Sequence, residues 1–248
     1  MLSKKDISAE NLWQFAYTNE ALLNNNIIEG IVLYFHGLGE QTLIKEHDEN
    51  AKIFAEDNIL YIIPFYGPWS WMNDGAVKTV DRVLDIVVDK FNISRDIPII
   101  SSGFSMGGLS ALTYPRFSKY REMIKAAAAN CPVCDLISLR DNREDIPRTT
   151  FYAFAHYDMD MDEAVKTVSP VHNINKMPDI PYFIAHCKED TDVPIKEHSD
   201  IMVKLMREHG FDITYIEVPD RGHVNLDEDT FNKFIEFIKR NIAENRNK

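Results

Sequence analysis

The stretch Ile-Ile-Ser-Ser-Gly-Phe-Ser-Met-Gly-Gly-Leu, residues 100–110, decides the fold. An apolar run leads into it and a segment of helical period follows, so we expect a strand, a tight turn and a helix. The pattern Gly-x-Ser-x-Gly places Ser105 in that turn. Glycine two residues before and after the serine avoids collisions in a strained turn, which favours an exposed nucleophilic hydroxyl. The pentapeptide alone also fits a flexible loop, so its meaning depends on the rest of the chain.

The rest of the chain alternates short apolar runs with longer segments of helical period. This alternation is typical of an α/β protein in which helices cover both faces of a mainly parallel sheet. We expect strands at residues 30–35, 59–64, 97–101, 125–130, 181–186 and 214–218. Residues 12–18 are expected to add an antiparallel edge strand. Crossover helices are expected at residues 76–91, 195–209 and 226–241.

One segment departs from this alternation. Residues 135–179 are polar and aromatic and form a connection far longer than is usual within a compact domain. Connections of this size are commonly functional, so we expect a small cap here and refer to residues 135–179 as the cap segment. The whole chain, residues 1–248, is expected to form a single domain around one core.

A nucleophilic serine needs a base that takes its proton. The strongest candidate is His223, which stands in Pro-Asp-Arg-Gly-His-Val-Asn between the last expected strand and the last expected helix. His156 and His172 are weaker rivals. Three further histidines lie in polar stretches and are expected to be solvated: His47, His198 and His209.

The base in turn needs a carboxylate that orients it. Asp190 and Asp192 both follow the strand expected at residues 181–186, and α/β sheets place their chemistry at the carboxyl ends of strands. Motif register favours Asp190, and Asp192 stays as the alternative. Nucleophile, acid and base then follow one another along the chain as Ser105, Asp190 and His223.

The stretch His-Gly-Leu-Gly at residues 36–39 is the candidate oxyanion loop. Its glycines allow the N–H of Leu38 to turn inward, where it can join the N–H of Met106 in binding a negatively charged oxygen. His36 is expected to brace this loop rather than to transfer a proton. Five of the ten glycines fall in this loop and in the turn around Ser105, which supports assigning both segments to one site.

Composition and charge exclude several classes of partner. The formal charge of −12 has the wrong sign for binding phosphates, so no nucleic-acid partner is expected. No apolar run is long enough to span a membrane, and residues 1–10 lack the apolar core of a secretion signal. Three cysteines are too few for a disulfide framework, so we expect a cytoplasmic protein. The oligomeric state is not predicted.

Other features give weaker indications. Cys131 and Cys134 have the spacing of a metal or redox pair, but no second pair accompanies them, so buried thiols are expected. The acidic run at residues 158–163 lacks the glycine of a calcium loop and is expected to be solvated. We therefore expect no metal and no organic cofactor. Four aromatic residues fit core packing and a substrate pocket equally well: Trp69, Trp71, Phe154 and Tyr157.

Together these motifs resemble those of the α/β-hydrolase superfamily, and more narrowly its esterase and prolyl-oligopeptidase-like branch, which includes dienelactone hydrolases. The matching segments, in the order of that branch, are residues 36–39, 103–108, 131–136, 169–173, 190–194 and 222–223. The resemblance implies the α/β-hydrolase fold from about residue 28 to the last helix, with a mainly parallel sheet. It also implies that Ser105 is the nucleophile, His223 the base and Asp190 the acid. Leu38 and Met106 would supply the oxyanion donors.

The resemblance implies a serine hydrolase that needs no cofactor. We expect a carboxylesterase that acts through an acyl-enzyme on small-molecule esters with short-chain or aromatic acyl groups, of the acetyl or hydroxycinnamoyl type. A small serine peptidase or amidase is the alternative, less expected because the chain lacks the N-terminal propeller of large oligopeptidases. A non-catalytic binding protein on the same fold is the third hypothesis. The chain departs from the branch at His186-Cys187, where the branch has His-Gly.

Overall fold

A seven-stranded sheet forms the centre of the structure, a computed structural model that describes residues 6–24 and 27–246. The strand order is β1-β3-β2-β4-β5-β6-β7, with β1 antiparallel to β3 and every other pair parallel. The prediction of a mainly parallel sheet with an antiparallel edge is therefore confirmed. Residues 1–5, part of the stretch searched for a secretion signal, lie outside the described residues. The strands are β1 Ala16–Thr18, β2 Gly30–Phe35, β3 Ile59–Pro64, β4 Ile99–Phe104, β5 Ile124–Asn130, β6 Tyr182–Cys187 and β7 Ile213–Val218.

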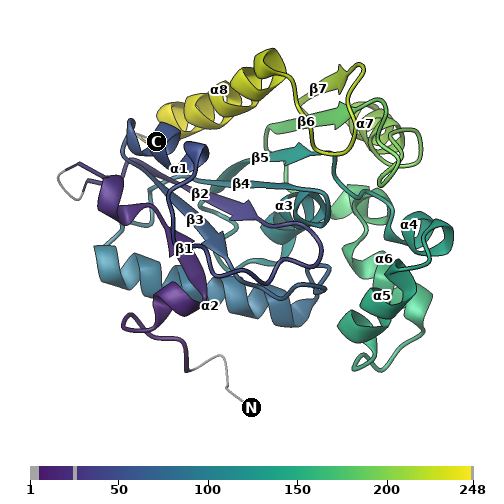
Figure 1. The fold of residues 1–248 in the computed structure, drawn as a ribbon, viewed down its shortest axis with the longest axis horizontal. Coiled ribbons are helices and arrows are strands. Elements are labelled where there is room, and N and C mark those ends of the chain that lie inside the picture. Colours follow the sequence, from purple (N-terminus) through teal and green to yellow (C-terminus); the bar gives the residue numbers. More distant parts are fainter. Residues whose placement is uncertain (1–5, 25–26, 247–248) are drawn as a thin grey trace.

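Helices cover both faces of the sheet, as expected (Figure 1). Successive strand residues point to opposite faces. Ile31 and Leu33 therefore join a core with α2 and α3, whereas Val32 joins a second core with α1 and α8. Helix α7 packs on the α3 side of β5 and β6. These helices are α1 Glu49–Ala55, α2 Asp74–Phe91, α3 Met106–Phe117, α7 Ser199–Glu208 and α8 Glu228–Asn245.

Two strands differ from their expected bounds by more than one residue at an end. Only the end of the 12–18 segment is a strand, because Ala16 pairs with Pro64, the last residue of β3, and no partner strand extends beyond it. Residues Leu12–Gln14 form the 3-10 helix η2 instead, and Glu20–Leu22 form η3. Strand β4 ends three residues later than predicted, because its last residues pair with both β2 and β5. The longer strand carries the sheet directly to Ser105.

Helix boundaries differ most where the chain turns before a helix begins. The helix expected at 195–209 starts only at Ser199, because hydrogen bonds from Glu197 to Pro194 and from His198 to Ile195 form a tight turn first. Helix α1 was not predicted. Its N-cap signal was available in the sequence, since the Asp48 side chain accepts from the N–H of Ala51 at 2.7 Å.

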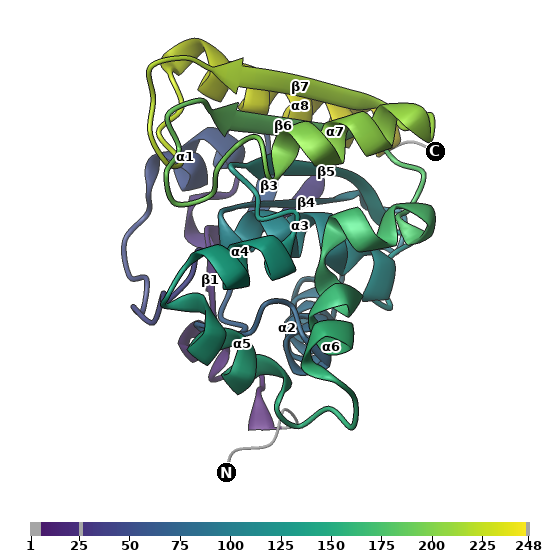
Figure 2. The same ribbon diagram turned by 90° about the vertical axis from the view of Figure 1, so that its right-hand side faces the viewer.

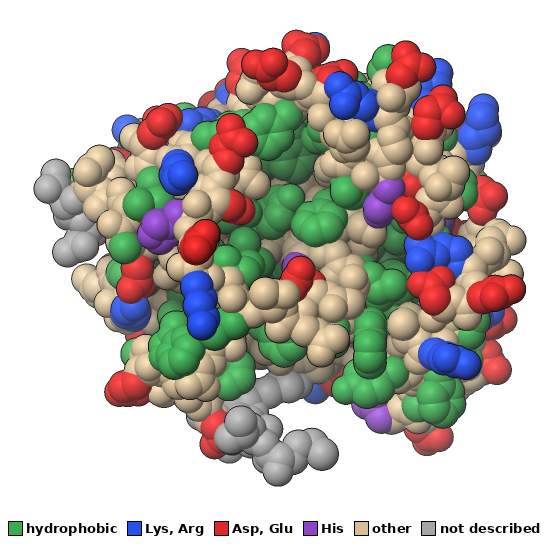
Figure 3. All heavy atoms as spheres, viewed as in Figure 1, with side chains coloured by type: hydrophobic (Ala, Val, Ile, Leu, Met, Phe, Trp, Pro, Cys, Tyr) green, Lys and Arg blue, Asp and Glu red, His purple; other side chains and the backbone are tan. Residues whose placement is uncertain are grey.

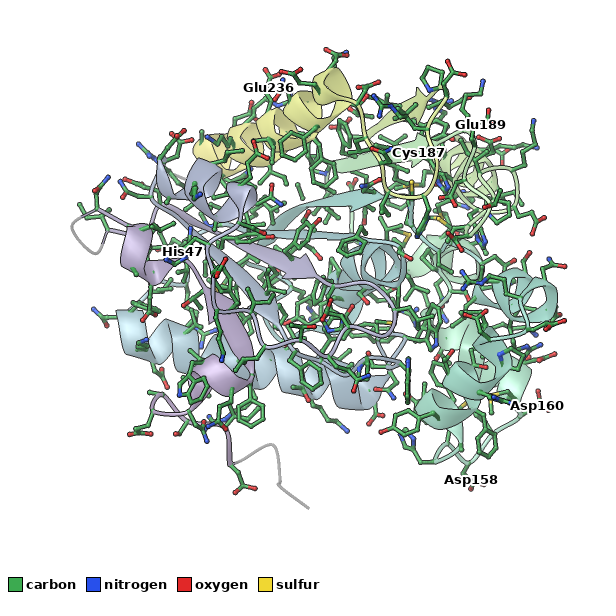
Figure 4. All side chains as sticks on the ribbon, in the orientation of Figure 1. His47, Asp158, Asp160, Cys187, Glu189 and Glu236 are labelled. Carbon is green, nitrogen blue, oxygen red and sulfur yellow. The ribbon has the colours of Figure 1, made fainter. Side chains whose placement is uncertain are left out.

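The cap segment is helical and lies beyond the carboxyl ends of the strands (Figures 1 and 2). Its Leu136, Ile146 and Phe154 join the core that α2 and α3 share, so the segment is packed onto the sheet layers. The exposed residues Asp158 and Asp160 point away from the fold at its outer end (Figure 4). Its helices are α4 Leu136–Asn142, α5 Ile146–Phe154, α6 Met161–Val168 and the 3-10 helix η4 Pro170–Lys176.

The surface and the helix lengths bear on possible partners. Within the described ranges, each helix is too short or too polar to cross a lipid bilayer. On the face drawn in Figure 3, Lys and Arg side chains lie scattered among Asp and Glu and form no continuous basic patch.

Candidate active site

Ser105 lies in the turn between β4 and α3 and has a strained backbone, with φ 57° and ψ −122°. Residues with a Cβ atom rarely adopt this conformation, and it persists only where the surroundings enforce it. The Ser105 N–H donates to the carbonyl of Asn130 at 3.0 Å, and its own carbonyl accepts from the N–H of Leu109 at 3.1 Å. These bonds hold the half-buried serine between the strand and the helix, in the turn that the Gly-x-Ser-x-Gly pattern predicted.

Glycines on either side of Ser105 allow the backbone to approach itself closely. A Cβ atom at Gly103 would overlap the carbonyl group of Gly107, and one at Gly107 would overlap the carbonyl oxygen of Phe35. Both obstacles are backbone atoms of the sheet and the turn, which cannot move aside as a flexible side chain could. Lack of space therefore requires glycine at both positions.

Asp190 and His223 meet at the carboxyl end of the sheet. The Nδ1–H of His223 donates to Oδ2 of Asp190 at 2.7 Å. The Asp190 side chain is fully buried, and its Oδ1 accepts from the N–H groups of Asp192 at 3.0 Å and Val193 at 2.8 Å. Burial raises the pKa of this carboxyl, but hydrogen bonds from His186, His223 and Val193 outweigh it and lower the pKa below its ordinary value. Asp190 is therefore a carboxylate at neutral pH.

Asp192, the alternative acid, is exposed and contacts Arg143 instead of His223. Its carbonyl oxygen accepts from Nη1 of Arg143 at 3.2 Å, and its Oδ1 lies 3.6 Å from the same atom. Arg143 also forms a bidentate pair with Asp145, with distances of 3.0 and 2.7 Å. Asp190 thus contacts His223, whereas Asp192 connects the turn after β6 to Arg143 of the cap segment.

A cavity of about 380 Å³ opens at Ser105 and His223. Both residues line it, so the serine and the proposed base share one space. One part of the lining is apolar and the other is charged, and the cap segment contributes to both. The remaining lining residues are Gly37, Leu38, Trp71, Phe104, Val133, Leu139, Arg143, Asp145, Ile146, Asp192 and Val193.

The loop after β2 brings Leu38 to the same cavity. His36 braces this loop as expected, because its Nδ1–H donates to the carbonyl of Gly37 at 2.9 Å and its own carbonyl accepts from Tyr66 at 2.8 Å. Gly39, with φ 81°, donates its N–H to the carbonyl of Pro68 at 2.8 Å. Burial lowers the pKa of His36. The histidine is therefore a neutral structural support.

Only one of the four aromatic candidates, Trp71, is among the described residues that line this cavity. Its indole Nε1–H donates to Oγ1 of Thr149 at 2.9 Å. Trp69 is 37% exposed and packs edge-on against Tyr152. Phe154 is buried in the core, and the Tyr157 hydroxyl accepts from the N–H of Asp74. Phe104 and the cap residues of the lining were not predicted from the sequence. Phe104 could have been found from its place directly before the serine.

Two buried histidines were not anticipated. His198 was expected to be solvated, and this is wrong: it is fully buried, and its Nδ1 accepts from the backbone N–H of Asp135 at 3.2 Å. Burial, with a smaller effect of His186, lowers its pKa to about 4. His186 is also fully buried and contacts Asp190. The rival bases lie elsewhere, with exposed His156 near Asp74 and His172 near Asp135.

Cys131 and Cys134 are buried free thiols, as expected. Cys131 and Cys134 contact different groups, since Cys131 Sγ accepts from the N–H of Cys187 at 3.4 Å, whereas Cys134 Sγ lies near the carbonyl of Pro132. Cys187 ends β6, close to the loop that follows β7 (Figure 4). A hydrogen bond with Cys187 and burial raise the pKa of the Cys131 thiol.

One group of metal-ligating side chains occurs among residues 6–24 and 27–246. Ligand atoms of Cys131, Asp190 and His223 lie within 4.8 Å of one another. The thiol is protonated near neutral pH, and the carboxylate and imidazole are hydrogen-bonded to each other. The chemistry of this donor set therefore fits an acid–base pair beside a buried thiol better than a metal site.

Comparison with known proteins places this geometry in context. The model of the prolyl oligopeptidase family matches residues 73–245, which include Ser105, Asp190 and His223. A search of curated proteins returned no match to the sequence.

Solved structures of several hydrolases superpose on the chain. A puromycin-hydrolyzing peptidase of Mycobacterium tuberculosis matches with TM-score 0.71 and 16% identity, over 88% of this chain and 34% of its own. The acylaminoacyl peptidase of Pyrococcus horikoshii matches with TM-score 0.69 and 10% identity, over 88% of this chain and 38% of its own. Esterase 2 of Thermogutta terrifontis, phosphoramylated by tabun, matches with TM-score 0.64 and 18% identity, over 92% of this chain and 88% of its own. The chain thus spans about a third of the length of the peptidases. These similarities confirm the predicted α/β-hydrolase fold.

Proposed function

Because the chain belongs to the prolyl oligopeptidase family and has the α/β-hydrolase fold, we propose that it is a serine hydrolase that cleaves carboxylic esters through an acyl-enzyme on Ser105. One observation carries the proposal: the 2.7 Å hydrogen bond between His223 and Asp190 lies at a cavity that Ser105 also lines. A strained serine, an imidazole and a buried carboxylate are the three parts that this chemistry requires.

In the proposed reaction, Nε2 of His223 takes the hydroxyl proton as Oγ of Ser105 attacks the ester carbonyl carbon. Asp190 accepts a hydrogen bond from the Nδ1–H group of His223, which keeps Nε2 available as the base and stabilises the imidazolium that forms. The imidazolium then protonates the leaving alcohol. Water, deprotonated by His223, hydrolyses the acyl-enzyme and frees Ser105. These steps use neither a metal nor an organic cofactor.

Backbone N–H groups of Leu38 and Met106 are proposed to bind the oxyanion. Met106 is the first residue of α3, and the first N–H groups of a helix have no acceptor within the helix. The positive end of the helix dipole also favours negative charge there. Leu38 follows Gly37 in the braced loop and lines the cavity. Two donors on separate rigid elements would stabilise the tetrahedral intermediate without reorganisation.

The cavity supports small acyl groups of aliphatic or aromatic type. Its apolar lining includes Trp71, Phe104, Leu139 and Ile146, and its volume of about 380 Å³ is near the lower end for ligand sites. An acetyl or a hydroxycinnamoyl group is compatible with this size and polarity. The match to esterase 2 over most of both chains also supports an ester substrate.

A small peptidase or amidase is the second candidate function. The charged groups of Arg143, Asp145 and Asp192 line the same cavity and are suited to peptide backbone or terminal groups. The first two solved structures compared above are peptidases. An amide is the harder substrate for the same triad, because its leaving group must be protonated more completely by His223.

Labelling with a fluorophosphonate probe, mapped by mass spectrometry, tests the proposal directly. Wild type should be labelled on Ser105, and Ser105→Ala should be neither labelled nor active on a chromogenic short-chain ester while it keeps its fold. A panel of acetyl, longer acyl and feruloyl esters against aminoacyl amides then separates the two candidates. Normal turnover by Ser105→Ala would rule out the mechanism, and an unlabelled wild type would favour a binding protein.

A further inference from the structure

A second histidine contacts the carboxylate of Asp190 from inside the protein. Nε2 of His186 lies 3.2 Å from Oδ2 of Asp190 and 2.8 Å from the carbonyl oxygen of Val193. The side chains of His186 and Asp190 are both fully buried. Because both neighbours of Nε2 are acceptors, this nitrogen carries a hydrogen in either protonation state of the ring. His186 therefore donates to the same oxygen that accepts from His223.

The hydroxyl group of Ser199 holds the other side of the His186 ring. Nδ1 of His186 lies 2.6 Å from Oγ of Ser199, the fully buried first residue of α7. Strand β6 carries the histidine and α7 carries the serine, so the contact joins two packed elements. The ring cannot rotate without breaking hydrogen bonds at both nitrogens.

All acceptor positions of Asp190 are therefore occupied. Oδ1 accepts from the N–H groups of Asp192 and Val193, and Oδ2 accepts from the two imidazoles. A carboxylate offers about four such positions, so this group has no freedom to turn within its site. The two backbone N–H groups fix the position of Oδ1. The imidazole of His186 adds a contact to Oδ2, the oxygen that accepts from His223.

We propose that His186, held by Ser199, is a positioning residue that keeps Oδ2 of Asp190 on His223 and shares its negative charge. The inference rests on the proposed function, because it assigns His186 a role only if Asp190 and His223 serve Ser105. An oxygen that accepts from two donors is a weaker acceptor toward each. Loss of His186 leaves a more mobile carboxylate that attracts the proton on His223 more strongly.

The titratable groups around Ser199, His186 and Asp190 determine whether the expected change in pH dependence can be assigned to the Asp190–His223 pair. Asp190 and His198 are titratable groups that interact with His186, Cys134 adjoins Ser199, Cys131 lies beside Asp190 and His223, and Cys187, whose pKa is lowered by its hydrogen bond with Cys131, interacts with Asp190. Burial lowers the pKa of His198 to about 4, and burial or hydrogen bonding raises the pKa of the Cys131 and Cys134 thiols. All three are therefore uncharged between pH 5 and 8. Cys187 is retained in wild type and in every variant, so the difference in pH dependence between wild type and His186→Leu reports on the Asp190–His223 pair.

The test compares His186→Leu, which removes the donor, with His186→Gln, whose side-chain amide can still donate. The matched control is His198→Gln, a change of an equally buried histidine whose hydrogen bonds go to the backbone N–H groups of Cys134 and Asp135 rather than to Asp190. Fluorophosphonate titration gives the concentration of reactive Ser105, so kcat and KM on p-nitrophenyl acetate refer to folded sites. For His186→Leu we expect kcat to fall about tenfold or more with KM changed less than about twofold. Its acidic limb of kcat/KM should move to higher pH.

The other variants decide between positioning and simple packing. His186→Gln should recover most of the lost kcat and should return the acidic limb of kcat/KM toward its wild-type pH. The control His198→Gln should lose stability but keep the wild-type kcat and acidic limb. Equal losses in His186→Leu and His186→Gln, or wild-type values in both, would overturn the inference. If His186→Leu does not fold, Ser199→Ala decides: a fall in kcat of about threefold with a moved limb supports the inference, and wild-type behaviour overturns it. Failure of the probe to label wild-type Ser105 would instead remove the proposed function itself.

Discussion

Asp190 and His223 are 33 residues apart in the chain and are joined by a hydrogen bond of 2.7 Å between Oδ2 and Nδ1. The neighbouring carboxylate of Asp192 instead lies near Arg143. We therefore expect Asp190→Asn to lower kcat by about a thousandfold or more, because an amide can force the wrong tautomer on His223. The matched variant Asp192→Asn should change kcat less than about threefold. Rates per titrated Ser105 check this pair, and similar losses in both variants would contradict the assignment.

The strain at Ser105 predicts that the active site costs stability. Ser105 has φ 57°, where glycine is favoured, and such conformations cost roughly 1–3 kcal/mol. Both Ser105→Ala and Ser105→Gly should be inactive, but Ser105→Gly should be more stable. Glycine also raises the entropy of the unfolded chain, which offsets part of this gain. The free energy of unfolding of Ser105→Gly should therefore exceed that of Ser105→Ala by about 1 kcal/mol. Urea unfolding of the two variants measures this difference, and a less stable glycine variant would argue against strain.

Features fixed by neighbouring residues could be predicted from the sequence. The glycines around Ser105 reflect a clash within one turn, and the strand runs reflect burial on both faces of a parallel sheet, so local pattern was sufficient. Asp190 was preferred over Asp192 by its place in a motif, and the structure brings Asp190 to His223.

Features that depend on distant packing could not be predicted. His198 stands among polar residues, and only the packing of α7 against the β5–α4 connection shows that it is buried. The aromatic residues of the cap segment gave no sign of orientation, so Phe154 and Tyr157 were not distinguished from Leu139 and Ile146, which do line the cavity. Secondary structure and the chain order of the site were accessible, whereas the shape of the cavity was not.

Arg143 connects the cap segment to the turn that carries Asp190. It pairs with Asp145 and donates to the carbonyl of Asp192 at 3.2 Å on the cavity wall. Arg143→Ala should raise KM about three- to tenfold with a smaller effect on kcat, because the wall loosens while the Asp190–His223 bond stays. Arg143→Lys should recover little, since a single ammonium cannot replace a planar bidentate group.

The control for Arg143 is Arg140→Ala. Arg140 also belongs to the cap segment and pairs with Asp141 and Asp162, but it does not line the cavity. This variant should leave KM within about twofold of wild type. Equal KM values for Arg143→Ala and wild type in steady-state assays would show that the connection has no part in substrate binding.

The buried His198 predicts that stability falls in mild acid. Its Nδ1 accepts from two backbone N–H groups, so protonation breaks these contacts, and burial lowers its pKa to about 4. The unfolded chain has an ordinary value near 6.5, so between pH 6.5 and 4 it binds more protons than the folded protein. The contribution of neutral His198 to the free energy of unfolding is therefore fully present above about pH 6.5 and is lost as the pH falls toward 4.

This histidine should contribute about 2 kcal/mol of the stability lost between pH 7.5 and pH 5, by the difference between the two pKa values. His198→Asn keeps an acceptor for the backbone N–H groups but cannot titrate, so its unfolding free energy should depend less steeply on pH. Because the other histidines are shared, the difference between the two urea-unfolding curves at pH 7.5 and 5 isolates His198. Parallel changes in wild type and variant would mean that the buried ring is protonated as easily as a solvated one.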